Sequence, residues 1–301
     1  MSAESMLATL SRSSGIRLVN STELYPSLHQ DGDAGLPLLL IENKLGRAVL
    51  ALQGAHLIAF QPAGKDELLW LSPKAVLQAG KTIRGGIPLC TPWFGPGPAG
   101  SSAHGFARTT VWSLVAANAR DDGSSSVALE LSSDDQLHPA WPHAFRFHLE
   151  VIVGSQLELR FSAENRSSTA APFAFAFHSY FAVPDVSEAS VSGLDGMRYI
   201  DKLDRGECKL QHGEVTIAAA TDRIYLDVPA TQILRHAAGN VTIESDARCA
   251  VVWNAGTNDV NIADIGQGNH AGYLCVERAD VAERAVTLQA GGQYRCWMRL
   301  A

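Results

Sequence analysis

The segment FRFHLEVIVGSQLELRFS (residues 145–162) carries the clearest structural pattern in the chain. Every odd-numbered residue from 145 to 153 is apolar, and the alternation returns between 157 and 161. A period of two places alternate side chains on opposite faces of a strand, so each arm is predicted to be a strand with one buried and one wet face. The Gly154-Ser155 turn between the arms predicts an antiparallel pair.

Short apolar segments bounded by turn residues continue along the rest of the chain. Four of them precede the centre, at 36–43, 48–53, 56–62 and 67–72. The turn Asp121-Asp122-Gly123, between two further apolar segments, predicts a second hairpin. No window sustains a helical period over three turns, so helices should be few and short. We therefore expect an all-β protein, a sandwich of two large and mostly antiparallel sheets.

Length and composition bear on the division into domains. The chain has 301 residues, of which 46% are hydrophobic and 18% are charged, so a sizeable core is possible. No low-complexity linker divides the chain. We expect a single domain spanning residues 1–301, with residues 1–14 loosely ordered.

Charge and cysteine content exclude several classes of function. The formal net charge is −7 and no block of Lys and Arg occurs, which argues against nucleic-acid binding. No apolar run approaches the ~20 residues of a membrane span, and residues 1–15 do not resemble a secretion signal. The five cysteines are scattered without a CxxC pair, so neither a disulfide framework nor a zinc knuckle fits their spacing. A cytoplasmic protein is expected.

The segment TIRGGIPLCTPWFGPGPAGSSAHGFAR (82–108) is unlike the strands around it. Its four prolines remove backbone donors and its glycines admit unusual backbone angles, so neither a helix nor a strand is expected there. Its aromatic and aliphatic anchors argue against disorder. We predict a shaped binding loop that presents Arg84, His104 and Arg108.

Three further residues with reactive side chains lie at the ends or in the interiors of predicted strands. His178 follows a run of alternating phenylalanines, and the alternative is a core histidine bonded to the backbone. Asp222 begins a predicted strand, and the alternative is an ordinary turn aspartate. Glu277 follows three apolar residues, which is an expensive place for a carboxylate unless it is paired or used. A Glu277 that faced water would remove that argument.

The sequence lacks several familiar motifs. It has no dinucleotide-binding GxGxxG after a strand, no phosphate-binding Gly-Lys-Ser/Thr loop and no GxSxG elbow. His138 and His143 share one loop without a third nearby ligand, so no metal site is expected. No cofactor is expected either. What remains is an acid–base pair of one histidine and one glutamate, with cationic hydrogen-bond donors nearby.

Six short motifs occur in the order seen in the aldose 1-epimerase superfamily. They are RGGIPLCTPWFG (84–95), AHGFAR (103–108), FHSYF (177–181), TDRIY (221–225), VVWN (251–254) and CVE (275–277). More narrowly, they resemble the glucose-6-phosphate 1-epimerase (D-hexose-6-phosphate mutarotase) branch. The resemblance runs from about residue 35 to the C-terminus, and six motifs in fixed order make it specific.

The resemblance implies a galactose-mutarotase-like supersandwich and an enzyme whose partner is a small sugar phosphate. We expect a monomer. It implies that His178 and Glu277 are the catalytic pair. It places the sugar phosphate against four further residues, Arg84, His104, Arg108 and Asp222. Some relatives carry a glutamine where this chain has Ala103, so a contact there must come from backbone or from a neighbour.

The implied reaction opens the hexose ring and interconverts its α and β anomers. An ionised Glu277 would take the proton of O1 while a histidinium at position 178 protonates the ring oxygen. The guanidinium groups of Arg84 and Arg108 suit a phosphate, although either could instead brace the loop through a carboxylate. Trp93 or Trp253 could lie against the apolar face of the sugar. Two alternatives remain open, an aldose 1-epimerase of free hexoses and a non-catalytic carbohydrate-binding module.

Overall fold

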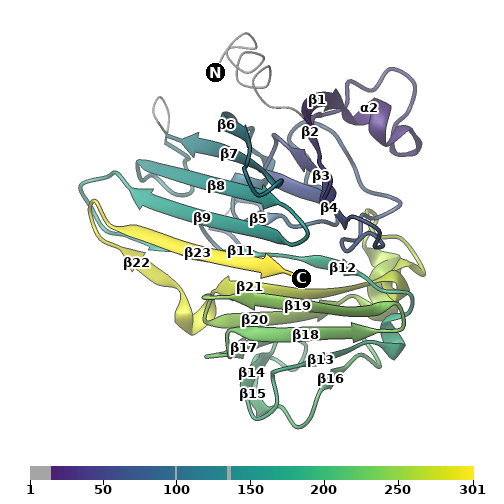
Figure 1. Ribbon diagram of the computed structural model, residues 1–301. Coiled ribbons are helices and arrows are strands. Elements are labelled where there is room, and N and C mark those ends of the chain that lie inside the picture. Colours follow the sequence, from purple (N-terminus) through teal and green to yellow (C-terminus); the bar gives the residue numbers. More distant parts are fainter. Residues whose placement is uncertain (1–14, 99, 134–136) are drawn as a thin grey trace.

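The computed structural model describes residues 15–98, 100–133 and 137–301, and within them strands predominate (Figure 1). The expectation of a loosely ordered start at residues 1–14 lies outside this part of the chain. Nine strands form one sheet, which Figure 1 shows running from β6 at the top to β16 at the bottom. Their order is β16 (Val215–Thr216), β13 (Ser190–Ser192), β18 (Thr231–His236), β19 (Gly239–Ser245), β23 (Gln293–Leu300), β9 (Leu157–Asn165), β8 (Phe145–Val153), β7 (Ser125–Ser132) and β6 (Ser113–Ala119).

A second sheet of eight strands packs against the first. Along its main path the order is β15 (Glu207–Leu210), β14 (Arg198–Asp201), β17 (Thr221–Leu226), β20 (Cys249–Asn254), β21 (Tyr273–Asp280), β11 (Phe175–Phe177) and β5 (Leu89–Cys90). The eighth strand, β12 (Tyr180–Ala182), also pairs with β21. All of these pairings are antiparallel, so the predicted all-β sandwich is confirmed.

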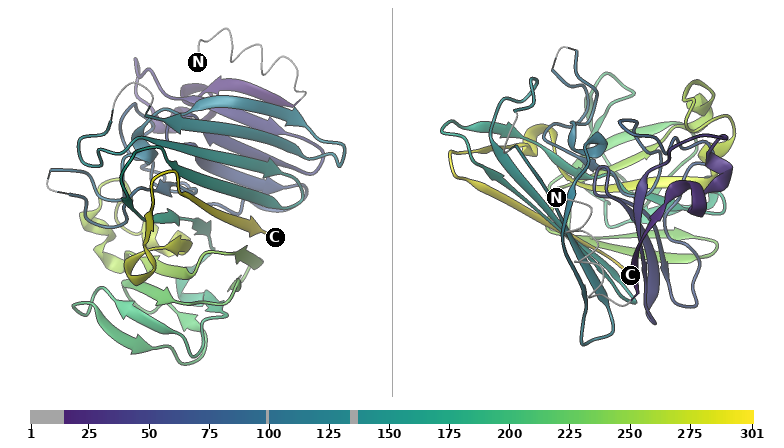
Figure 2. Two further views of the ribbon diagram at one scale, coloured as in Figure 1. Left: turned by 90° about the vertical axis from the view of Figure 1, so that its left-hand side faces the viewer. Right: turned by 90° about the horizontal axis from the view of Figure 1, so that it is seen from above.

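Smaller elements complete the described fold. A four-stranded sheet contains β1 (Ile16–Asn20), β2 (Pro37–Glu42), β3 (Gly46–Ala51) and β4 (His56–Pro62), and β10 (Ala171–Phe173) pairs with β22 (Val286–Leu288). The four-stranded sheet lies beside β6–β9 in both views of Figure 2, and the amide of Asn43 joins it to them by donating to the carbonyl of Val153 at 2.9 Å. The helical segments are α2 (Ser21–Leu24), η1 (Pro26–Leu28), η2 (Ala107–Thr109), η3 (Val186–Glu188), η4 (Gly256–Asn261), η5 (Asn269–Gly272) and η6 (Ala282–Arg284). No helix in the described ranges is long and apolar enough to cross a membrane.

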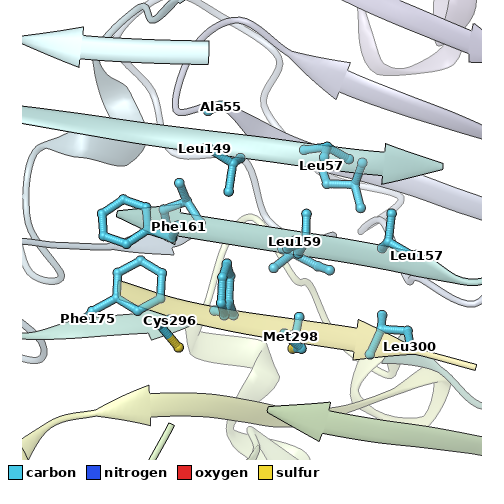
Figure 3. Packing of buried hydrophobic residues seen from close by; sticks show 14 of the residues in the cluster. Ala55, Leu57, Leu149, Leu157, Leu159, Phe161, Phe175, Cys296, Met298 and Leu300 are labelled. Atoms are coloured by element: carbon cyan, nitrogen blue, oxygen red, sulfur yellow. The ribbon is translucent and has the colours of Figure 1, made fainter. Parts of the chain in front are cut away.

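The hairpin predicted from residues 145–162 forms as β8 and β9. Val153 lies opposite Leu157 across the Gly154-Ser155 turn, and the odd-numbered residues of both arms are buried. Their side chains enter the core between the two large sheets, where Phe161 of β9 stacks on Phe175 of β11 with ring centroids 4.1 Å apart (Figure 3). The odd-numbered apolar residues that the sequence pattern singled out therefore form the contact between the two large sheets.

Two predictions about local structure were wrong. Residues 67–72 form two isolated bridges rather than a strand, because their backbone bonds to several segments in turn: Trp70 donates to Tyr180 and Ser72 to Arg84. The long loop was expected to hold neither strand nor helix, yet it contains β5 and the single turn η2. Strand β5 forms there because Leu89 and Cys90 lie between the prolines and their backbone can pair with β11.

Candidate active site

The pairing of β21 with its two short neighbours brings His178 and Glu277 together. Phe177, the last residue of β11, lies opposite Arg278, and Tyr180, the first residue of β12, lies opposite Cys275. Both pairings belong to one continuous antiparallel register, which places His178 directly opposite Glu277. Residues opposite each other in such a pair point to the same face of the sheet.

The two side chains are in contact and nearly buried. His178 Nε2 lies 3.3 Å from Glu277 Oε1, and the exposed fractions of the side chains are 10% and 1%. His178 Nδ1 and Glu277 Oε2 are buried and have no hydrogen-bond partner among the described residues. Buried polar atoms are normally paired, so two unpaired atoms on adjacent reactive groups indicate a place where a polar ligand binds.

The pair lies on the face of the eight-stranded sheet that is turned away from the main core. Glu277 is opposite Val251 of β20 and, two residues along, Cys275 is opposite Trp253. Trp253 is in turn opposite Asp222 at the start of β17, so Asp222 shares this face. Small apolar residues fill the same face, among them Cys90, Ala176, Cys249, Val251 and Ala279. This environment leaves Glu277 with few polar neighbours.

The long loop places His104 beside the pair and holds Arg108 against the backbone next to His104. The ring centroid of His104 lies 5.8 Å from that of His178, and His104 Nδ1 accepts a hydrogen bond from Gly95 N at 3.4 Å. Since Nδ1 accepts, the Nε2–H of a neutral His104 is available as a donor. Arg108 donates to the carbonyl of Ala103 at 2.8 Å, and its Nε is buried without a partner among the described residues.

Arg84 also reaches this face, but it already has an anionic partner. Its guanidinium donates to the hydroxyl of Tyr180 at 2.9 Å and lies 3.2 Å from Asp264 Oδ1. The alternative in which one arginine braces the loop through a carboxylate therefore describes Arg84. Its Nε is nevertheless buried and unpaired within the described residues, and a quarter of the side chain is exposed.

Asp222 has a cationic neighbour that sequence reasoning missed. Lys202 Nζ lies 2.9 Å from Asp222 Oδ2, and Lys202 N donates to the carbonyl of Asp222 at 2.9 Å. Lys202 follows β14 in a polar turn, and nothing in that turn distinguishes it from other surface lysines. Only the pairing of β14 with β17 brings it to the site, so a sequence pattern could not have found it.

Of the two tryptophans considered for a sugar-stacking role, Trp253 is the one beside the pair. Its ring centroid lies 6.2 Å from that of His178. Trp93 packs instead on Phe106 and His138, and its indole N–H donates to the carbonyl of Ser102 at 3.1 Å. His138, which the sequence placed near His143, stacks on Phe106 with centroids 4.2 Å apart. Within the part of the chain that the structure describes, no group of three His, Cys, Asp or Glu side chains is arranged to hold a metal ion.

Burial shifts the pKa values of both members of the pair. Burial lowers the pKa of His178 well below its ordinary 6.5, and the nearby His104 and Arg108 lower it further. Burial raises the pKa of Glu277 well above 4.5 and the charge of Asp222 adds to this, while Lys202 and Arg108 oppose it. Both shifts favour the uncharged forms of the two groups, a neutral imidazole and a protonated carboxyl.

The fold and the site together define a class of protein, a β-supersandwich with a buried histidine–glutamate pair on its outer sheet face. Residues 37–301 match the aldose 1-epimerase family. The chain belongs to that family.

Individual relatives agree with this assignment. The chain is 36% identical over 261 residues to a Salmonella typhimurium protein named "Putative glucose-6-phosphate 1-epimerase", covering 85% of this chain and 87% of the relative. A crystal structure described as a "putative mutarotase (YeaD)" from Salmonella typhimurium superposes with a TM-score of 0.83 at 30% identity, over 98% of each chain. A galactose mutarotase-like protein from Clostridium acetobutylicum shares the fold, with a TM-score of 0.69 at 15% identity over 88% of this chain and 95% of its own.

Proposed function

We propose that this protein is a hexose-6-phosphate mutarotase that interconverts the α and β anomers of glucose 6-phosphate and similar hexose 6-phosphates. The observation that carries the proposal is the buried contact between His178 Nε2 and Glu277 Oε1 at 3.3 Å in a chain of the aldose 1-epimerase family. The names of the relatives support glucose 6-phosphate as the substrate. Membership of the family favours an enzyme over a carbohydrate-binding module without activity.

The chemistry requires one proton held by the pair. Ring opening begins once the shared proton has passed from Glu277 Oε1 to His178 Nε2, which are 3.3 Å apart. The carboxylate of Glu277 then takes the proton from O1, the bond between C1 and the ring oxygen breaks, and His178 gives its proton to the ring oxygen. The pair then consists of a protonated glutamate and a neutral histidine, which are the forms that burial favours. After rotation about C1–C2 the protons return and the ring closes on the other face. The total number of protons on the pair does not change.

The surrounding residues are proposed to bind the sugar phosphate. Arg108 and the Nε2–H of His104 supply donors next to the pair, and Arg84 bonds to Tyr180, whose ring stacks on that of His178. Asp222 accepts hydrogen bonds from ring hydroxyls, and Trp253 offers its ring to the apolar face of the sugar. Burial together with Arg108 lowers the pKa of His104 to about 3, so His104 acts as a neutral donor.

The direct test follows the anomeric proton signals of α-glucose 6-phosphate and of α-glucose by NMR, with and without the protein. We expect faster anomerisation of both sugars, with a higher kcat/KM for the phosphorylated one. A higher kcat/KM for free glucose would favour the alternative of an aldose 1-epimerase of free hexoses. Calorimetric binding without any change in either rate would favour a carbohydrate-binding module.

The proposal also covers the state of the protein. We propose a single-domain monomer in the cytoplasm, where its five unpaired cysteines would stay reduced. One core cluster extends from Ile16 to Leu300, which supports a single cooperative unit. A single melting transition and a mass of about 32 kDa by light scattering are expected. Two separate transitions or a dimer mass would contradict this part.

A further inference from the structure

Aromatic contacts, and not a hydrogen bond to Nδ1, hold the ring of His178 in place. Nδ1 is buried without a partner among the described residues, while Nε2 lies 3.3 Å from Glu277 Oε1. The imidazole stacks on the ring of Tyr180, with centroids 4.9 Å apart and planes 9° apart. The ring of Trp253 lies at 74° to the imidazole, with centroids 6.2 Å apart. The plane of the imidazole therefore follows the position of Tyr180.

Two charged side chains fix Tyr180 at its hydroxyl. Arg84 donates to that hydroxyl at 2.9 Å through Nη1, and Nη2 of the same guanidinium lies 3.2 Å from Asp264 Oδ1. A guanidinium is a rigid planar fork, so partners on both of its arms leave it little freedom to turn. No more than a quarter of either charged side chain is exposed, so salt and water screen their attraction only in part. The hydroxyl of Tyr180 is thus tied to the carboxylate of Asp264.

The segment that carries Asp264 is itself anchored. Asp264 lies between η4 and η5, and the next residue, Ile265, is fully buried in one apolar cluster with Tyr180. The backbone N–H of Ile265 donates to the carbonyl of Ile262 at 2.9 Å, and its carbonyl accepts from the side-chain amide of Asn269 at 2.8 Å. The series of contacts that ends on His178 therefore starts from a fixed point.

Resting on the proposed function, we infer that Asp264 and Tyr180 are positioning residues that act through Arg84 and the stacked rings to hold Nε2 of His178 toward Glu277 and the substrate. A misplacement of a reacting group by about 1 Å can cost on the order of 100-fold in rate, so the orientation of the ring matters for the chemical step. Because His178 serves ring opening in every aldose, a loss of positioning should affect phosphorylated and free sugars alike.

Tyr180→Phe and Asp264→Asn test the two ends of this series of contacts. Phenylalanine keeps the ring and removes only the hydroxyl that Arg84 holds, and asparagine keeps the size of the aspartate and removes its charge. Tyr225→Phe is a matched control. Tyr225 is also fully buried and its hydroxyl donates to Gln211 Oε1 at 2.8 Å, but it belongs to β17 and packs in the main core of the sandwich. It therefore loses a similar bond without a contact to the pair.

The first measurement is the rate of anomerisation of both sugars. In each test variant kcat for glucose 6-phosphate should fall about tenfold or more with KM changed by less than about threefold, and kcat/KM for glucose should fall by a similar factor. The double variant should lose no more than about twofold beyond the more impaired single variant, because both changes release the same ring. Tyr225→Phe should leave kcat unchanged. An unchanged kcat, a loss confined to KM for glucose 6-phosphate, or losses that multiply in the double variant would each overturn the inference.

The second measurement observes the ring of His178. The NMR shifts of its carbon-bound protons report the stacking on Tyr180, and they are assigned by their absence from a His178→Asn variant. Asp264→Asn changes neither ring, so we expect these signals to move in Asp264→Asn and to stay in place in Tyr225→Phe, with both variants folded by their Tm. Signals that stay in place in Asp264→Asn would overturn the inference even if kcat falls. A wild type that accelerates neither sugar would refute the proposed function alone, since the shifts still test whether Asp264 positions His178.

Discussion

At the scale of single residues, Glu277 occupies a costly position for an ionisable group. A carboxylate that is 1% exposed among alanines, cysteines and valines is strongly destabilised in its charged form. Burial therefore raises the pKa of Glu277 and lowers that of His178, which favours the uncharged form of each. Each exchange of protons with the substrate converts the pair between its uncharged forms and a carboxylate with a histidinium. One shared proton therefore serves both directions of the reaction.

The protonation of His178 can be observed directly. Because burial lowers its pKa, the imidazole should still be mostly neutral at pH 6.5, and its NMR signals should titrate only at lower pH. The signals are assigned by their absence from a His178→Asn variant, and the exposed His212 serves as an internal comparison. A midpoint at or above pH 6.5 for His178 would contradict the account.

Glu277 should also reduce stability as the pH rises. In the unfolded chain its carboxyl loses its proton near the ordinary pKa of 4.5, whereas in the folded chain it keeps the proton until a higher pH, so the free energy of unfolding falls across that interval. Glu277→Gln cannot ionise and avoids this loss. We expect its Tm to exceed that of the wild type by roughly 2 °C or more at pH 8, with a smaller difference at pH 4.5. A Tm difference that does not grow with pH would be evidence against a raised pKa.

At the scale of elements, the junction between β11 and β12 positions the site. Both short strands keep one register against β21, and the two residues between them include His178, whose backbone N–H donates to the carbonyl of Pro88 at 3.1 Å. Because His178 lies between β11 and β12, its backbone N–H can bond to the long loop, which also carries Arg84 and Arg108. One strand pairing therefore brings together groups that are about 100 residues apart in the sequence.

The long loop depends on a close backbone approach at Gly105. Its φ is +75°, and a Cβ there would lie 1.8 Å from the carbonyl oxygen of Thr91. Gly95 has the same φ of +75° but open space around it. An alanine at position 95 therefore meets only the conformational cost of a positive φ. Gly95→Ala should cost about 1–2 kcal/mol, and Gly105→Ala clearly more, with loss of activity. Urea unfolding measures both, and equal losses would mean that the contact with Thr91 does not matter.

Sequence patterns predicted some of these elements and not others. Alternation alone located β8 and β9. The motif order suggested six candidate site residues, and the structure places them on one sheet face or on the loop beside it: His178, Glu277, Arg84, His104, Arg108 and Asp222. The sequence could not reveal Lys202 or Asp264 as neighbours of the site. Lys202 reaches Asp222, and Asp264 reaches Arg84, through strand and loop pairings that have no local sequence pattern. The raised pKa of Glu277 also escaped prediction, since it depends on how completely neighbouring strands exclude water.

At the scale of the whole molecule, two sheets enclose the main core and leave the outer face of the eight-stranded sheet for the site. Phe161 and Phe175 stack between the two sheets (Figure 3), and Phe175 belongs to β11, the strand that directly precedes His178. Arg278, the neighbour of Glu277, points to the opposite side and bonds to the carbonyls of Pro229 and Ala230, each at 3.2 Å. Core packing and the site therefore share the same strand.

Truncating the inter-sheet contact should weaken the whole fold. Phe161→Ala removes a buried ring and should lower the free energy of unfolding by about 3–5 kcal/mol. Val115→Ala on the exposed side of β6, where the residue is 43% exposed, should change it by less than about 0.5 kcal/mol. Chemical denaturation of the two variants is the measurement. Similar stabilities would contradict the central place given to the core between the sheets.

The central claim is that His178 and Glu277 exchange protons with a hexose 6-phosphate. The most direct measurement is the rate of anomerisation of α-glucose 6-phosphate with wild type, His178→Ala and Glu277→Gln at equal protein concentration. The account predicts acceleration by the wild type and a loss of at least ~100-fold in each variant, although Glu277→Gln remains folded. Acceleration that survives unchanged in both variants would contradict it.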